Sequence, residues 1–377
     1  MKKQIVKEFI TVKRVRRLPR PPAPPAPPPP LKVLVVGRCT LDIITICNEH
    51  PTPGQVQRTT EGTWRLGGSA SNVCIVLRRL GMECSFLGQL TSALTFESLE
   101  SSFQAMGVGI STCPRTPKSP AHRNIVGVRG DDTHTIVEYS SPEHELTYQQ
   151  FVGAVDYRKY AWIHFESRRP KETLRMLKAV QDFNALNPET RIVVSVDLND
   201  MRPINLLMGE FADYVLVRSR LQTQYAYMNG RETVWAVREQ MAVARKRWMA
   251  SRAKKRPCVI KRELVEPAHE QSCALTTERQ PIIIVENYSE GASCLMTDGV
   301  YFKVGAHTPQ KVVDSIGEHD AFVGAFIYAL LEPKLTLRDA MEYGTRATVL
   351  KIGDNGFDCL RRMPKDLISC YYTQQQC

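Results

Sequence analysis

Apolar runs of four or five residues recur along the chain and alternate with longer amphipathic stretches. Residues 33–37 form a continuous apolar run that ends in glycine, which is typical of a buried parallel strand. Similar runs lie at residues 84–87, 162–165, 192–196, 214–217 and 282–285. Helical patterns separate several of these runs, as at residues 171–183. The alternation predicts an α/β fold in which helices cover both faces of a central, mostly parallel sheet.

Two helices near the predicted sheet have clear signatures. Residues 69–80 place four apolar side chains on one helical face, those of Val73, Val76, Leu77 and Leu80. Ser69 is the predicted N-cap of this helix, and Gly81 is its stop signal. Residues 321–331 are so apolar that they predict a buried helix, and they fall short of the roughly 20 residues that span a bilayer. We therefore expect no membrane association.

A different pattern lies between residues 124 and 139. Two short strand-like runs, residues 124–128 and 134–139, are joined by Arg129-Gly130-Asp131-Asp132. Glycine and aspartate between two such runs are a hairpin signal. This hairpin is expected to form a small lid sheet beside the main one.

The first 30 residues stand apart from the predicted folded domain of residues 31–377. Residues 19–30 contain nine prolines, and such a tract adopts the extended polyproline II conformation. The pattern favours a stiff spacer over a ligand for an SH3-type or WW-type module. Residues 2–17 resemble a mitochondrial presequence only weakly, because they contain Glu8 and no serine. The predicted location is therefore the cytosol.

The net charge of +11 is concentrated in two segments. Residues 1–20 carry +7 and residues 238–262 carry +9, so the rest of the chain carries −5. Residues 231–256 predict one long basic helix, and the pattern after residue 261 has no periodicity, so residues 231–280 form a predicted insertion. Solvated charge explains both segments better than nucleic-acid binding does. The 11 cysteines include no Cys-x-x-Cys pair, which argues against a metal site or a disulfide framework.

Three polar segments carry candidate chemistry. In the first, residues 37–42, Asp42 follows the first predicted strand, where open α/β sheets bind ligands, and its carboxylate can accept two sugar hydroxyls. The second is Gly67-Gly68-Ser69-Ala70-Ser71-Asn72, whose glycines permit close backbone approach to a ligand. Ser69 and Asn72 lie three positions apart at a helix start, so both side chains can face one pocket.

The third segment, residues 313–320, enters the apolar helix. A loop that enters a helix presents unpaired backbone N–H groups and the positive end of the helix dipole, which together bind anions. Asp320 on the first turn can accept a proton from an attacking hydroxyl. Phosphoryl transfer depends mainly on positioning and charge stabilisation, so one base beside an anion site is a sufficient set of groups.

These three segments, in this order and spacing, resemble the ribokinase family, also called PfkB carbohydrate kinases. The family has Gly-Gly-Asn-Ala-Ser-Asn in place of residues 67–72, and Asp-Thr-x-Gly-Ala-Gly-Asp in place of residues 314–320. The resemblance is closest to the ketohexokinase (fructokinase) branch and extends over residues 31–359, with an interruption after residue 230. An ordered set of motifs is far more specific than a single glycine motif.

The resemblance implies an ATP-dependent kinase that phosphorylates a ketohexose such as fructose, with Mg²⁺ bridging the ATP phosphates and no direct protein ligand to the metal. Asp320 would be the catalytic base, and the amides of Gly317, Glu318 and His319 would form the anion hole. The implied sugar ligands are Asp42, Gly68, Ser69 and Asn72. The implied nucleotide pocket contains Gly291, Gly353, Gly356 and Phe357. The lid strands would also form a homodimer contact.

Two departures from the family motifs keep other functions open. His319 replaces the second glycine of the anion-hole motif, which predicts either a strained backbone or intact amides with the side chains turned away. A protonated His319 could partly offset the charge of Glu318. Ser69 replaces the first asparagine of the sugar motif. The alternatives are a catalytically degenerate kinase fold that binds or regulates, and a ribose or nucleoside kinase of the same fold.

Overall fold

The computed structural model describes residues 32–59, 61–128, 134–253, 280–287 and 289–364. The proline-rich arm, the tip of the predicted lid hairpin and residues 254–279 of the predicted insertion lie outside these ranges. No helix in the described ranges is long and apolar enough to cross a membrane.

An eight-stranded sheet forms the centre, in the order β14-β13-β12-β11-β10-β9-β1-β4. Its strands are β1 (Lys32–Val36), β4 (Glu83–Leu87), β9 (Trp162–Glu166), β10 (Val193–Leu198), β11 (Tyr214–Arg218), β12 (Ile282–Asn287), β13 (Gly291–Leu295) and β14 (Tyr301–Val304). Neighbours from β4 to β12 pair in parallel, whereas β13 and β14 add an antiparallel edge. The six strands predicted from apolar runs are confirmed, and they lie side by side because parallel strands bury both faces.

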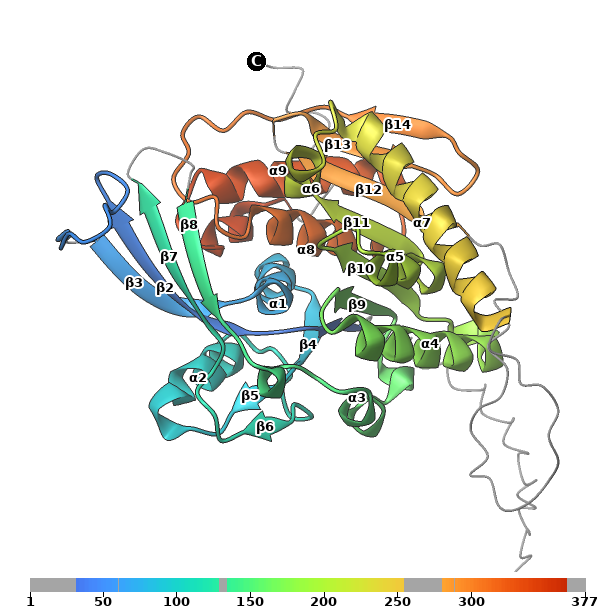
Figure 1. Cartoon of the computed structure of the whole chain (residues 1–377), viewed down its shortest axis with the longest axis horizontal. Coiled ribbons are helices and arrows are strands. Elements are labelled where there is room, and N and C mark those ends of the chain that lie inside the picture. The colour runs from blue at the N-terminus through green and yellow to red at the C-terminus, as the bar shows by residue number, and fades with distance from the viewer. Residues whose placement is uncertain (1–31, 60, 129–133, 254–279, 288, 365–377) are drawn as a thin grey trace, which may run out of the picture. The chain divides into compact units, whose positions relative to one another are not determined.

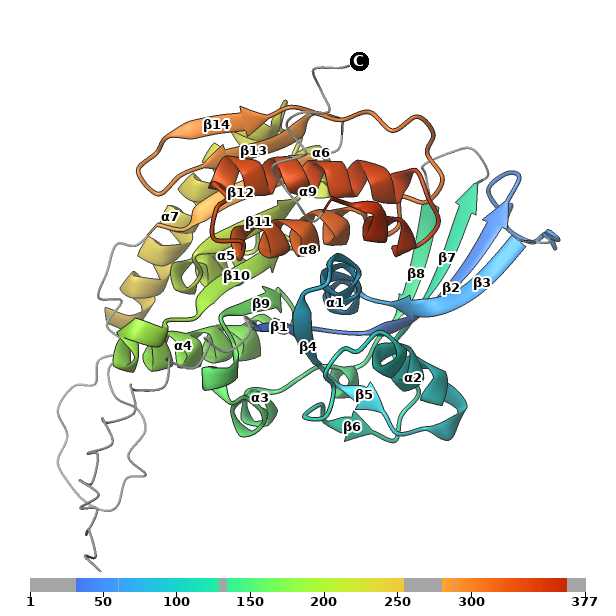
Figure 2. The same cartoon turned by 180° about the vertical axis from the view of Figure 1, so that it is seen from behind.

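Helices cover both faces of this sheet (Figures 1 and 2). One face carries α1 (Ser69–Leu80), α8 (Glu318–Leu330) and α9 (Leu337–Ile352). The other carries α4 (Pro170–Leu186), α5 (Pro203–Leu206) and α7 (Gly230–Ala253). Shorter elements are α2 (Glu97–Ala105), α3 (Tyr148–Ala154), α6 (Ser219–Gln224), β5 (Leu90–Thr91) and β6 (Arg115–Thr116). The predicted α/β fold with two helical layers is confirmed.

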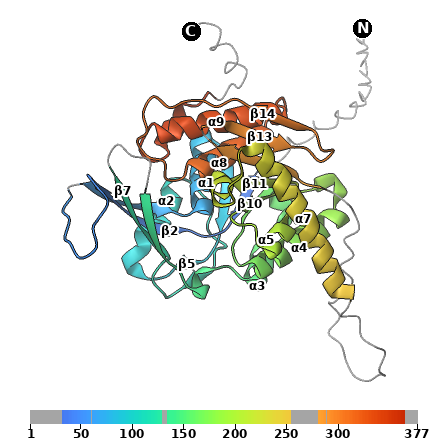
Figure 3. The same cartoon turned by 45° about the horizontal axis from the view of Figure 1, so that its top comes forward.

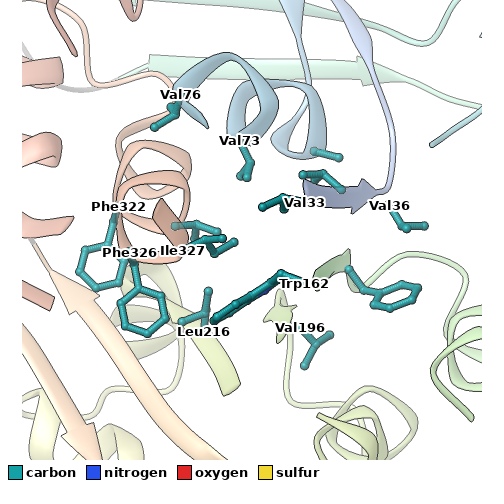
Figure 4. Packing of buried hydrophobic residues seen from close by; sticks show 14 of the residues in the cluster. Val33, Val36, Val73, Val76, Trp162, Val196, Leu216, Phe322, Phe326 and Ile327 are labelled. Carbon is teal, nitrogen blue, oxygen red and sulfur yellow. The ribbon is translucent and has the colours of Figure 1, made fainter. Parts of the chain in front are cut away.

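The core packs α8 against α1 and the sheet (Figure 4). Trp162 on β9 faces Leu216 on β11 and the aromatic side chains of α8, Phe322 and Phe326. Residues 319–329 of α8 are all buried, so the predicted buried helix is confirmed. Gly324 is required at the crossing, because a Cβ there would lie 2.6 Å from Val76.

The termini of α1 correct one prediction and confirm another. Gly68, with φ 95°, is the N-cap, and Ser69 is the first helical residue rather than the cap. Gly81 ends the helix in the left-handed conformation, as expected. In α7, four apolar residues at helical spacing form a buried stripe, namely Val234, Val237, Met241 and Ala244. The basic helix therefore packs on the domain along this stripe.

A second sheet, in the order β3-β2-β7-β8, lies beside the first (Figure 3). It contains β2 (Thr40–Cys47), β3 (Glu61–Gly67), β7 (His122–Val128) and β8 (His134–Tyr139). The antiparallel pairing of β7 with β8 confirms the hairpin, but the sheet has two further strands that the apolar pattern does not predict. Asp42 follows β1, as expected, and lies within β2. We call this four-stranded sheet the lid.

Candidate active site

Polar side chains gather at the carboxyl edge of the parallel strands, next to the starts of α1 and α8. The chain leaves β1 into β2 at this edge, and β10, β11 and β12 end there. Carboxyl ends of parallel strands are where open α/β sheets place their ligands. The three predicted motifs all reach this edge.

Asp320 lies in the first turn of α8 and is 3% exposed. Its Oδ2 accepts a hydrogen bond from Asn72 Nδ2 at 2.7 Å, and its Oδ1 accepts one from Arg218 at 3.1 Å. The fold thus joins the predicted base to the predicted sugar motif across 248 positions of sequence. Both carboxylate oxygens are held in place by donors from other elements.

Arg218, the last residue of β11, is a site residue that the sequence motifs do not indicate. Its guanidinium donates to Asp320, to Ser69 Oγ at 2.8 Å and to Asp197 Oδ2 at 2.6 Å. Burial by itself raises the pKa of Asp197, but Arg218 and His319 outweigh burial and hold the pKa well below its usual range. Asp197 and Arg218 are therefore charged partners. Their only sequence signal is their place at the ends of two buried strands.

His319 turns into the protein beneath the anion-hole loop. Its Nε2 lies 3.1 Å from Asp197 Oδ1, and its Nδ1 lies 3.7 Å from Glu286 Oε2. Burial by itself lowers its pKa, but Asp197 and Glu286 outweigh burial and raise the pKa to about 9. Its charge is therefore matched to these two carboxylates. His319 is right-handed helical, so the expected backbone strain is absent from this segment.

The loop before α8 has the conformation that an anion site needs. Gly317 is the N-cap with φ 89°, and a Cβ there would lie 2.6 Å from the ring of Phe357. Within the described ranges, the amides of Gly317, His319 and Asp320 donate no hydrogen bond to the protein. The amide of Glu318 is predicted to belong to the anion hole, but it donates to Ser315 O at 3.1 Å and is therefore already used. The free amides at a helix start suit an anion.

Asp42 is held by its own chain. Thr40 donates to Oδ1 at 2.6 Å, and Arg123 from β7 forms a two-pronged ion pair with both carboxylate oxygens. A Cβ at Gly67 would overlap this carboxylate at 2.0 Å, and one at Gly68 would lie 2.5 Å from Arg38 O. These glycines therefore accommodate other parts of the chain. A sugar that binds Asp42 must share it with Arg123.

Asp314 connects the lid to the predicted nucleotide segment. Its carboxylate is 2.9 Å from Arg65 of β3 and 2.9 Å from Lys351 of α9, and it accepts the amide of Gly356 at 3.0 Å. Burial by itself raises the pKa of Asp314, but Lys351 and Arg65 outweigh burial and lower it to about 2. Gly356 and Phe357 are thus brought to the loop that carries Gly317.

The other two predicted nucleotide residues lie at different places. Gly353 is the C-cap of α9, against the backbone of Lys311. Gly291 begins β13 with φ 88°, and a Cβ there would lie 2.2 Å from Val304 O. Glycine is therefore required at position 291 by the packing of β13 against β14. In the described parts of the chain, no cluster of three or more histidine, cysteine or acidic side chains could hold a metal ion.

The family is decided by comparison with known proteins. A model of the pfkB family carbohydrate kinases matches residues 30–198 and 261–359. The chain belongs to this family of carbohydrate kinases. The family segments include all three motifs, so the resemblance inferred from them is confirmed.

Individual relatives agree with the family. The chain is 27% identical to a ketohexokinase of Mus musculus over 330 residues, which cover 87% of this chain and 98% of that protein. Among solved structures, ribokinase from Giardia lamblia superposes with a TM-score of 0.67 at 14% identity, over 91% of this chain and 99% of that one. A fructokinase with bound ATP from Xylella fastidiosa gives 0.62 at 18% identity, over 92% and 99%. The two structures support the ribokinase-like fold.

As a carbohydrate kinase, the protein must hold a sugar hydroxyl near a base and near the donor phosphate. Asp320 is a carboxylate beside a helix start with free amides, so proton acceptance and anion binding are possible at one place. Asn72 lies against this carboxylate and also belongs to the sugar motif. The arrangement can therefore support transfer of a phosphoryl group to an alcohol.

Proposed function

We propose that the protein transfers the γ-phosphoryl group of ATP to a hydroxyl of a ketohexose such as fructose, with Asp320 as the general base. The hydrogen bond between Asn72 and Asp320, beside the free amides of the α8 start, carries this proposal. It puts the sugar motif, the base and an anion site within one cluster. The preference for a ketohexose is supported by similarity to the mouse ketohexokinase.

The sugar would bind between the lid and α1. Asp42, Ser69 and Asn72 present oxygen and nitrogen atoms there, and Gly68 permits the tight turn into α1. Sugar hydroxyls would form hydrogen bonds with these groups. The hydroxyl that is phosphorylated would give its proton to Asp320. The ion pair between Asp42 and Arg123 would loosen as the sugar takes its share of the carboxylate.

The triphosphate would approach the start of α8. The amides of Gly317, His319 and Asp320 fit an anionic group, because each lacks a protein acceptor within the described ranges. Gly356 and Phe357 would border the nucleotide next to this loop, with Gly353 at the end of α9 and Gly291 on the neighbouring antiparallel strands. Mg²⁺, when bound to the phosphates, would neutralise charge that develops on the transferred group.

The test is an assay of purified protein with Mg²⁺ and ATP against fructose, ribose and adenosine. We expect fructose-dependent ADP release, and we expect Asp320→Ala to lower kcat by about 10²- to 10⁴-fold, since that is the usual contribution of a general base. Asp182→Asn is the matched control, because Asp182 lies on α4 and its side chain is 63% exposed. A preference for ribose or adenosine would move the substrate to another branch. No turnover by folded protein would favour a binding or regulatory role.

We further propose a homodimer formed through the lid. Trp64, Ile43, Asn124 and Val137 are directly opposite one another across its four strands, so they lie on one face. Trp64 is 73% and Val137 64% exposed. Trp64, Ile43 and Val137 are apolar, and an exposed apolar face of this kind supports a protein contact at this surface.

The oligomeric state can be tested by sedimentation. Val137→Asp should shift the protein from dimer to monomer. Leu186→Asp, at an 82% exposed position on α4, should leave the dimer intact. A wild-type protein that sediments as a monomer at micromolar concentration contradicts the proposal.

A further inference from the structure

Arg218 is the one basic side chain that reaches both the sugar motif and the catalytic carboxylate in the described part of the chain. Its terminal nitrogen lies 2.8 Å from Ser69 Oγ and 3.1 Å from Asp320 Oδ1. The same nitrogen lies 2.6 Å from Asp197 Oδ2, and Nε lies 3.0 Å from that oxygen. The guanidinium therefore forms a bridge from the end of β10 to the first turn of α8.

The groups behind Arg218 fix it in place. Asp197 Oδ2 accepts hydrogen bonds from both Nε and a terminal nitrogen of Arg218, and this fixes the plane of the guanidinium. The second oxygen of Asp197 is held by His319, and Glu286 lies on the far side of that imidazole. Charge therefore alternates from Glu286 to Asp320 through buried side chains. His164 is a further ionisable neighbour, and burial lowers its pKa to about 4, so it is neutral at pH 7.

Arg218 stays charged in this setting. Burial by itself lowers its pKa, but Asp197 and Asp320 outweigh burial and raise it. A permanent cation with fixed geometry can hold a carboxylate in one rotamer, which a neutral or flexible donor does less well. Ser69 contributes a further acceptor, because its hydroxyl oxygen accepts a hydrogen bond from Arg218.

We propose that Arg218 is a positioning residue for the base, and that it fixes the carboxylate of Asp320 together with Asn72. Each donor holds one carboxylate oxygen, and each oxygen keeps a further lone pair for the sugar hydroxyl. Reaction rates depend steeply on such placement, since a displacement of about 1 Å can cost about 100-fold. This role rests on the proposed kinase function of Asp320.

The same two strands provide a matched control. At their amino ends, Arg191 donates to Asp213 Oδ1 at 2.6 Å, and the two side chains are 29% and 7% exposed. The pair of Arg218 with Asp197 is also short, at 17% and 2% exposed. Both pairs join β10 to β11, but only the second one touches Asp320.

The experiment compares Arg218→Gln, Arg218→Lys and Arg191→Gln in the full chain, beside wild type and Asp320→Ala. Steady-state kinetics give kcat and KM for the preferred sugar and for ATP, and thermal melts report stability. We expect Arg218→Gln to lower kcat by about 100-fold with each KM within about threefold of wild type. Arg218→Lys should recover part of kcat, since it restores the charge but not the fork. Arg191→Gln should lower the melting temperature without lowering kcat.

Two kinds of result would overturn the role of Arg218. One is an active wild type, inactivated by Asp320→Ala, in which Arg218→Gln keeps kcat within threefold or increases it. The other is an equal loss of kcat in Arg218→Gln and Arg191→Gln, which would make the effect one of stability. Either would leave the proposed kinase function standing. A wild type that phosphorylates no sugar would instead overturn both the function and the positioning role.

Discussion

The central sheet and the lid sheet are built in opposite ways. In the central sheet, strands such as β9 and β13 are buried at every position, and helices cover both faces. In the lid, β8 is exposed at all six positions. The lid face that carries Trp64 and Val137 is apolar and exposed. The opposite face carries a charged row formed by Arg65, Asp42, Arg123 and Glu138.

Two residues of the charged row form ion pairs with the rest of the domain. At one edge Arg65 pairs with Asp314, and at the other edge Glu138 pairs with Arg38 at 2.6 Å. Ion pairs of this kind are partly solvated and respond to salt, whereas apolar burial does not. The difference indicates that apolar burial dominates in the central sheet, while the two edges of the lid also depend on ion pairs that salt can weaken.

The largest expected effect lies in the core. Phe326→Ala on α8 removes a side chain that is 0% exposed and should lower the free energy of unfolding by about 3–5 kcal/mol, through lost burial and a residual cavity. Thr63→Ser on the lid, at an exposed position of β3 outside the proposed dimer face, should change it by less than about 0.5 kcal/mol. Urea denaturation of both variants measures the contrast. Similar losses in the two would show that the lid is as integral to stability as the core.

The next effect is the pH dependence that His319 should confer. Its pKa is raised to about 9 in the folded protein, against about 6.5 when unfolded, so its stabilisation is complete below pH 6.5 and lost as pH rises to 9. We expect a loss on the order of 3 kcal/mol across this window, since one pKa unit corresponds to about 1.4 kcal/mol. Urea midpoints at several pH values should fall for wild type and remain flatter for His319→Gln. Parallel curves for the two proteins would contradict the raised pKa.

A smaller effect is expected at the lid edge. Arg65→Gln removes a part-buried charge from Asp314 and should raise KM for the sugar by about fivefold, equivalent to about 1 kcal/mol. Wild-type KM should increase with added NaCl, and the variant should respond less. Arg175→Gln on α4, where the side chain is 51% exposed, is the control. An identical salt dependence in wild type and Arg65→Gln would separate the ion pair from sugar binding.

Local patterns predicted most of the central domain. The six apolar runs became neighbouring parallel strands, and the apolar residues before Leu331 became α8, because burial of both sheet faces requires continuous apolar sequence. Strands β2 and β3 were missed for the inverse reason. Their sequences mix charged and apolar residues, since one face of the lid meets a charged site and the other is exposed.

Part of the site could also be predicted. Asp320 and Asn72 lie in motifs at helix starts, where backbone conformation and free amides follow from local sequence. Arg218 and Asp197 have no such motif. A single arginine or aspartate at a strand end is consistent with a solvated residue until its partners are known.

The sequence by itself determined the fold class, the kinase family and the places of its three motifs, because periodicity and glycine positions act over a few residues. Tertiary structure alone decided which charged side chains pair with the residues of those motifs. The pairs formed by Arg218 with Asp320 and by Arg65 with Asp314 are separated by 102 and 249 positions. Only folding brings such groups together, and their burial beside opposite charges then sets their pKa values.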